Sequence, residues 1–138
     1  MTAWTNDELD KIAAADELKI SSLRRDGTLR KPVTIWVVRY GDDLYVRSAY
    51  GCASTWFRGT RDLCEGHIRA GGVEKDVTFV DMDPNIDEQI DAAYRAKYQR
   101  YGARFVTLMV SPEARAATIK LVPREPVSLA GSTPDRLG

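Results

Sequence analysis

The first apolar positions of the chain form the start of a helix. Thr5, followed three residues later by Glu8, has the spacing of a capping box, and Trp4 and Leu9 stand at the two positions of a hydrophobic staple around it. Because these signals are independent and agree, they predict a helix over residues 6–15.

A period of two, which is typical of β-strands, then continues to residue 80. Its longest apolar run is residues 33–40 (VTIWVVRY), and this run predicts one strand that is buried on both faces. A short helix capped by Ser54 (residues 55–63) interrupts the strands. Turns that contain glycine predict hairpins, and therefore antiparallel pairing, at residues 26–27, 41–43 and 71–72.

A second, longer helix is predicted to begin at Asp83 and Pro84, since a capping residue is followed there by proline at the first helical position. Acidic residues stand in its first turn and basic residues in its last, as the helix dipole favours. Gly102 is expected just beyond its last turn. Two more strands are predicted after it, at residues 104–110 and 116–122.

This order predicts an α+β fold with an antiparallel sheet of six to seven strands closed into a small barrel. The barrel would carry an N-terminal helix, a short inserted helix and a long helix before the last strands. We expect one domain over residues 1–123 and a flexible tail over residues 124–138, where no apolar period is present. Neither a G-x-G-x-x-G pattern after a strand nor a P-loop occurs in the sequence, which argues against a Rossmann or NTPase fold.

The charges of the 138 residues cancel, with 20 basic and 20 acidic side chains. Such balance argues against nucleic acid or a membrane as the main partner, because both attract a strongly positive surface. The first residues lack a signal peptide pattern and no apolar run approaches ~20 residues, so a cytoplasmic protein is expected. Cys52, Cys64 and the single histidine, His67, do not form a metal-ligand pattern, and no metal is expected. A Cys52–His67 catalytic pair is a weak hypothesis.

A cationic turn is the first candidate for ligand chemistry. Residues 19–31 contain five Lys or Arg side chains and one acidic side chain around the Asp26-Gly27 turn. Cations beside outward-pointing backbone N–H groups are typical of phosphate sites. A solvated hairpin tip that keeps a sheet edge soluble is the alternative interpretation.

The second candidate is the strand exit at residues 48–57, where small residues, a glycine and hydroxyls precede a helix N-terminus that would attract an anion. Taken alone, the segment is better explained as an ordinary strand-to-helix turn anchored by Trp56 and Phe57.

The third candidate is a stripe of aromatic rings on the long helix, formed by Ile90, Tyr94, Tyr98 and Tyr101. Such a stripe can pack against the rest of the core, or it can form one wall of a ligand site in which the phenol hydroxyls donate hydrogen bonds to the ligand.

These segments together resemble a bacterial family of short uncharacterised proteins over most of residues 4–123. The layout is also similar, more distantly, to split-barrel flavin-binding proteins, both pyridoxamine-phosphate-oxidase-like proteins and deazaflavin-dependent nitroreductases. In the nitroreductases a basic turn resembles residues 24–31, a strand exit resembles residues 48–57, and a late helix with tyrosines resembles the stripe.

The resemblance implies a split β-barrel homodimer that binds FMN or a deazaflavin and transfers hydride to or from a small molecule. It implies catalytic roles for Tyr98 and Tyr101 and a substrate-binding role for Tyr94. The cofactor would be bound by Arg24, Arg25, Arg30, Lys31, Gly51, Ser54, Thr55 and Trp56. Two alternatives stay open: a cofactor-free enzyme or ligand-binding protein that uses the same pocket, and a non-catalytic dimeric interaction module.

Overall fold

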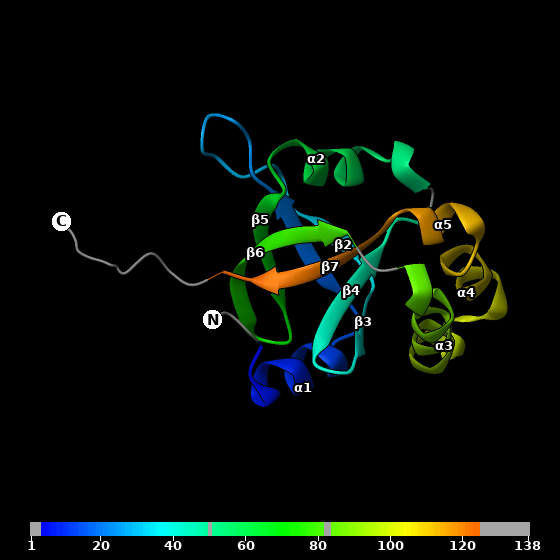
Figure 1. The fold of residues 1–138 in the computed structure, drawn as a ribbon. Coiled ribbons are helices and arrows are strands. Elements are labelled where there is room, and N and C mark those ends of the chain that lie inside the picture. The colour runs from blue at the N-terminus through cyan, green and yellow to red at the C-terminus, as the bar shows by residue number, and fades with distance from the viewer. Residues whose placement is uncertain (1–3, 50, 82–83, 125–138) are drawn as a thin grey trace.

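The computed structural model describes residues 4–49, 51–81 and 84–124 (Figure 1). Within these ranges seven antiparallel strands form a nearly closed barrel with five α-helices around it, which confirms the predicted α+β barrel. The strands are β1 (Leu18–Ser22), β2 (Val33–Ile35), β3 (Val37–Tyr40), β4 (Asp43–Arg47), β5 (Glu65–Ala70), β6 (Val73–Asp81) and β7 (Thr118–Pro123). The α-helices are α1 (Asn6–Ala14), α2 (Thr55–Leu63), α3 (Asp87–Tyr98), α4 (Ala103–Met109) and α5 (Pro112–Ala116).

The predicted single strand over residues 33–40 is wrong, because the chain forms two strands there. The sheet order is β2-β1-β5-β6-β7-β4-β3, so its two edge strands follow one another directly in the sequence. Trp36 separates them, and at this residue the chain leaves one edge of the sheet for the other. Val33 and Thr34 are exposed, whereas Val37 and Val38 are buried on opposite faces of β3. Residues 33–40 therefore connect the two edges of the sheet and bring the barrel close to closure.

The N-terminal helix is confirmed with its caps. Thr5 accepts a hydrogen bond from the Glu8 backbone N–H (3.1 Å), and the Glu8 carboxylate accepts one from the Thr5 N–H (3.0 Å). Trp4 and Leu9 are buried in the barrel core, and the Trp4 indole N–H donates to the Leu121 carbonyl (3.0 Å). Helix α1 thus covers one end of the barrel, while α2 lies at the opposite end (Figure 1).

The strand predicted at residues 104–110 is also wrong, since this segment is helix α4. Val106 and Met109, three residues apart, are buried against the outside of the sheet. Phe105 and Leu108, also three apart, line one hollow. The segment thus has a helical period, although its β-branched and aromatic residues favour a strand. Tertiary packing overrides local propensity here.

The long helix starts later than predicted. Asp83 lies outside the described residues, Pro84–Ile86 forms a 3-10 turn, and α3 begins at Asp87. After α3 a second 3-10 turn, Gln99–Tyr101, ends at Gly102, whose φ of 106° suits glycine.

Apolar residues form two cores, one inside the barrel and one between its outer face and helices α3 and α4. Strands β3 and β4 contribute to both, because alternate residues face opposite sides. Arg124, the first residue of the predicted tail, donates its backbone N–H to the Asp76 carbonyl (2.8 Å). Residues 125–138 lie outside the described part of the chain, so the tail stays a prediction. No helix among the described residues is long and apolar enough to cross a membrane.

Candidate ligand-binding site

The cationic turn and helix α2 enclose a hollow of about 320 Å³, which we call the cationic hollow. Its volume lies at the small end of the range of ligand pockets, ~300–1,000 Å³. In Figure 1 the loop after β1 lies beside α2. Residues of β1, the turn, β2 and α2 line the hollow: Ile20, Ser22, Arg24, Arg30, Lys31, Val33, Thr55, Trp56 and Thr60.

The turn itself is built by local hydrogen bonds. Gly27, at a φ of 89°, donates to the Arg24 carbonyl (3.0 Å), and the Arg24 N–H donates to the Thr28 carbonyl (2.7 Å). The Asp26 carboxylate accepts from the hydroxyl (2.6 Å) and backbone N–H (3.0 Å) of Thr28. These two bonds hold the pKa of Asp26 below its usual range. The one acidic side chain of the turn is thus engaged within the turn.

Helix α2 approaches the turn closely at Gly59. A Cβ atom at this position would lie 2.5 Å from the Ser22 hydroxyl and 3.0 Å from Nε of Arg30. A glycine is therefore needed where Arg30 lies against the helix. The sequence gives no direct sign of this role, since Gly59 stands inside a helical segment.

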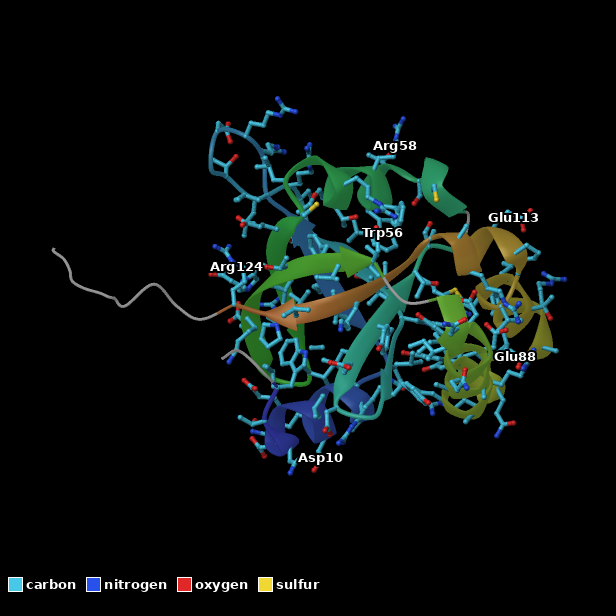
Figure 2. All side chains as sticks on the ribbon, in the orientation of Figure 1. Asp10, Trp56, Arg58, Glu88, Glu113 and Arg124 are labelled. Carbon is cyan, nitrogen blue, oxygen red and sulfur yellow. The ribbon has the colours of Figure 1, made fainter. Side chains whose placement is uncertain are left out.

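A second, mostly apolar hollow of about 360 Å³ adjoins the first, and we call it the apolar hollow. Val33 and Trp56 line both. Figure 2 shows Trp56 on the side of α2 that faces the barrel. The other residues that line the apolar hollow are Thr34, Ile35, Trp36, Arg47, Ser48, Ala49, Ser54, Phe105, Leu108 and Met109.

Ser48 and Ser54 supply hydroxyl groups to the apolar hollow, and their Oγ atoms are 2.7 Å apart. Ser54 stands at the N-cap of α2, as predicted, but its side chain does not cap the helix; it bonds to Ser48 and to the Gly51 carbonyl (3.3 Å). Gly51 and Arg25 line neither hollow. Gly51 instead packs against Glu113 of α5, and Arg25 is exposed.

Arg47 is a buried charge that the sequence analysis did not find. Its guanidinium donates to the Thr118 hydroxyl (2.8 Å), to the Met109 carbonyl (3.0 Å) and to the carboxylate of Asp91. Asp91, only 1% exposed, also accepts from Arg115. Burial favours the protonated acid, but the bonds from Arg115 and Arg47 outweigh it and keep the pKa of Asp91 below its usual range. An arginine at the end of a strand pattern normally indicates exposure, so no sequence signal reveals this network.

The tyrosine stripe lies apart from both hollows. Tyr94 and Tyr98 are buried, and neither lines a hollow. The Tyr98 hydroxyl donates to the Asp16 carbonyl (2.7 Å) and accepts from the Val37 N–H (3.1 Å). Burial raises the pKa of both phenols. Exposed Tyr101 donates to the Asp16 carboxylate (2.7 Å).

Trp36 connects the two regions. Its ring stacks on Tyr98, with centroids 4.0 Å apart and planes inclined by 2°, and the same side chain lines the apolar hollow. The tyrosine stripe therefore supports a wall of the hollow from behind.

His67 and Cys52 are far from any shared site. His67 lies on β5 between Asp76 and Glu74, with contacts of 3.0 and 3.1 Å. Burial opposes its protonation, but these two carboxylates outweigh that effect and raise the pKa of His67. Cys52 is exposed and its thiol faces the Ala116 carbonyl (3.6 Å). Among the described residues no group of three or more His, Cys, Asp or Glu side chains could hold a metal ion.

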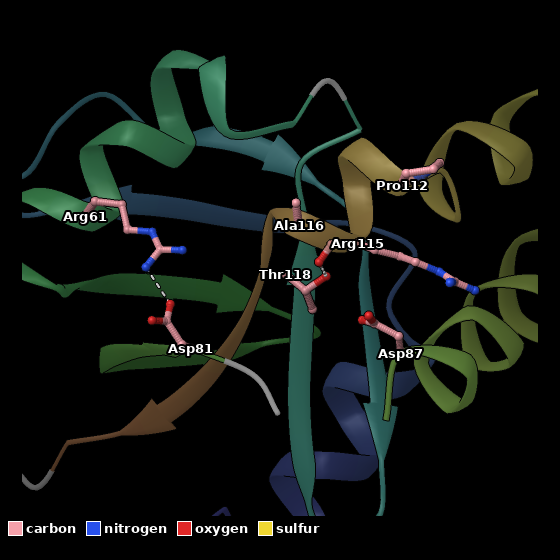
Figure 3. Close-up of a pocket in the computed structure, with 7 residues that line it drawn as sticks. All are labelled: Arg61, Asp81, Asp87, Pro112, Arg115, Ala116 and Thr118. Atoms are coloured by element: carbon pink, nitrogen blue, oxygen red, sulfur yellow. Dashed lines mark hydrogen bonds and ion pairs between the residues drawn. The ribbon is translucent and has the colours of Figure 1, made fainter. Parts of the chain in front are cut away.

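Another hollow, of about 570 Å³, lies between α2 and α5 (Figure 3). Its charged side chains already have partners. Arg61 pairs with Asp81, Arg115 with Asp91, and Asp87 with Arg47. A ligand would have to displace these ion pairs, so the two hollows joined at Trp56 are the better candidate.

Comparisons with known proteins agree with this fold. Residues 8–121 match the family described as "Uncharacterized protein conserved in bacteria (DUF2255)". No curated protein matches the sequence. Among solved structures, the chain is similar to the protein Atu2129, of unknown function, from Agrobacterium tumefaciens, with 9% identity and a TM-score of 0.60. The match covers 83% of this chain and 50% of that chain, so this chain spans half of its length.

Two further structures match over most of both chains. The heme storage protein HutZ from Vibrio cholerae has 12% identity and a TM-score of 0.57, with 85% of this chain and 87% of that chain covered. An F420 reductase has 14% identity and a TM-score of 0.56, with 86% and 92% covered. At these identities the likeness is one of fold. The predicted resemblances, to a bacterial family and to split-barrel proteins, are confirmed.

Proposed function

We propose a flavin-binding function for this chain, which belongs to the bacterial family DUF2255 and has a split-barrel fold. The cofactor is a phosphate-bearing flavin or deazaflavin, a class that includes the predicted FMN, and the activity is hydride transfer to or from a small organic molecule. One observation carries the proposal: a cationic hollow and an apolar hollow share Val33 and Trp56 as a common wall. A molecule with an anionic end and a flat apolar ring system fits such a pair. The fold likeness to an F420 reductase supports it, since F420 is a deazaflavin.

Arg24, Arg30 and Lys31 would bind the phosphate, with the Thr55 hydroxyl as a further donor. Trp56 would pack against the ring, and Ser48 and Ser54 would offer hydroxyls to its polar edge. The lining thus consists of cations, hydroxyls and apolar rings, which bind, orient and exclude water. The cofactor supplies the redox chemistry when bound. Arg25 and Gly51 line neither hollow, so we give them no direct contact.

The positions of the tyrosines favour support over catalysis. Tyr98 is buried and its hydroxyl bonds to backbone groups, so it has no free donor to offer a substrate. Tyr94 is equally buried. Tyr101 is 40% exposed and lies 5.5 Å from Trp36 between ring centroids, which leaves it the most accessible of the three. We propose that Tyr98 positions Trp36.

We also propose that the protein is a homodimer. Phe105 is 51% exposed and Val33 37% exposed, and both line the apolar hollow. A second chain over this rim would cover apolar surface and close the hollow to water. Sedimentation velocity should show a dimer that Phe105→Glu converts to monomer; a monomeric wild-type protein would refute this part of the proposal.

The test of cofactor binding is a titration of the purified protein with FMN and with a deazaflavin, followed by cofactor fluorescence. We expect saturable binding of one of them in the micromolar range or tighter. Arg24→Ala combined with Lys31→Ala should weaken it at least about tenfold, because two phosphate ligands are lost. Arg95→Ala, which removes an exposed arginine of α3, is the control and should change nothing. Failure to bind either cofactor would end the redox proposal.

A further inference from the structure

A second cationic hollow lies along α2, next to the first. Its volume is about 460 Å³, and it is lined by Arg30, Thr55, Arg58, Gly59 and Arg61. Arg30 and Thr55 also line the cationic hollow. The two hollows are therefore neighbours that share Arg30 and Thr55.

The charges of this second hollow differ in how they are engaged. Arg61 is ion-paired with Asp81. Arg58 is exposed, and no ion pair joins it to any side chain that the structure describes. Figure 2 shows Arg58 on the side of α2 that points away from the barrel. Arg58 thus offers a cation to a ligand group that lies beyond Arg30.

Gly59 explains how Arg30 borders both hollows. A Cβ atom there would lie 2.5 Å from the Ser22 hydroxyl and 3.0 Å from Nε of Arg30, so any other residue would require these side chains to shift. Glycine inside a helix costs about 1 kcal/mol relative to alanine. Helix α2 carries this cost at Gly59, where the Arg30 side chain lies against it.

We infer that the bound cofactor carries two linked phosphoryl groups, as in a flavin dinucleotide, with the first among Arg24, Arg30 and Lys31 and the second beside Arg58. This inference rests on the proposed function and names the ligand class more closely. Arginine binds phosphoryl oxygens through two parallel N–H groups, and successive arginines along a groove suit successive phosphoryl groups. A single phosphate would engage the first hollow and leave the Arg58 side without a ligand.

The inference is tested by measuring dissociation constants for riboflavin, FMN and FAD by fluorescence, with the wild-type protein and with Arg58→Ala. We expect FMN to bind more tightly than riboflavin, and FAD to bind at least about tenfold more tightly than FMN. In Arg58→Ala the FMN constant should stay within about twofold of wild type, whereas the advantage of FAD over FMN should largely disappear. This advantage should also shrink with added salt, because it arises from an exposed charge.

Arg95→Ala is the matched control, since it removes an exposed helical arginine far from α2 and should preserve the advantage of FAD. Arg58→Lys should retain part of it, because the charge stays while the paired donors are lost. Equal affinity for FMN and FAD in the wild-type protein would overturn this inference and leave flavin binding intact. An FAD advantage that persists in Arg58→Ala would also overturn it, since the adenosine would then account for the gain. If none of the three bound while a deazaflavin did, this inference alone would be overturned; if the deazaflavin also failed to bind, both proposals would be overturned.

Discussion

The cationic turn and the tyrosine stripe of α3 both predict a ligand site, yet they lie in different environments. The cations of the turn stay at the surface around an open hollow, whereas Tyr94 and Tyr98 are buried. The difference follows from the cost of desolvation: an exposed cation keeps its water or binds a ligand, whereas a phenol ring is apolar enough to be buried, as Tyr98 is with its hydroxyl bonded to backbone groups. A ligand site needs groups that a ligand can reach. Among the described residues the cations of the turn meet this condition, whereas the buried phenols do not.

The largest effect should come from the buried side chains of α3, which we call the closed side, at Asp91. Asp91→Ala leaves the guanidinium of Arg47 buried without its carboxylate, which should reduce the free energy of unfolding by about 3–5 kcal/mol. Urea denaturation measures this. Asp10→Ala, which removes an exposed partner of Arg39, is the control and should cost less than about 1 kcal/mol. If both variants lost equal stability, the buried network would not hold α3 in place.

A smaller effect is expected at Arg24, in the cationic turn, which we call the open side. Arg24→Ala should weaken cofactor binding about tenfold, because one charged phosphate ligand is lost. Its free energy of unfolding should stay within about 0.5 kcal/mol of wild type, since this side chain is exposed and its contact with the Thr28 hydroxyl is long, at 3.4 Å. A loss of stability in place of affinity would show that the turn is structural, and the contrast between the two sides would disappear.

Tyr98→Phe sharpens the contrast because it separates support from catalysis. Removing the hydroxyl leaves the Val37 N–H and the Asp16 carbonyl without this partner, so we expect a loss of about 1 kcal/mol of stability. Cofactor affinity should change less than about twofold, because the ring that stacks on Trp36 is kept. A catalytic phenol would give the opposite result, with normal stability and a large fall in kcat.

The elements that could be predicted from sequence are those fixed by near neighbours. The capping box of Thr5 and Glu8 and the turn at Gly71-Gly72 depend on residues a few positions apart, and both are found in the structure. The break at Trp36 could not be predicted, because the positions of the two sheet edges depend on pairings between strands distant in sequence, β1 with β5 and β4 with β7. Helix α4 was missed for a related reason: its strand-like composition is overridden by packing against the sheet.

The candidate site divides in the same way. The cations and Trp56 could be identified from their types and order, and the structure places several of them around one hollow. That Gly59 gives Arg30 its place on α2 could not be foreseen, since the contact joins residues far apart in the chain. Arg47 and Asp91, separated by 44 positions, are hidden for the same reason. Residue type predicts what a side chain can do, but its partners decide whether it is free to do it.

The smallest effect expected is a dependence of stability on acid that belongs to the closed side alone. Because the pKa of Asp91 is lower in the folded chain than in the unfolded chain, its contribution is complete above the unfolded value. It is lost as the pH falls through the folded value. As the pH falls below the unfolded value, we therefore expect Asp91 to contribute to the fall in unfolding free energy, measured with urea. Arg115→Gln removes one of the two cations and should make this loss begin at higher pH. Arg24→Ala should follow the wild-type curve, since no carboxylate of the buried network contacts Arg24 among the described residues. A shifted curve in Arg24→Ala would mean that the open side is coupled to the buried network after all.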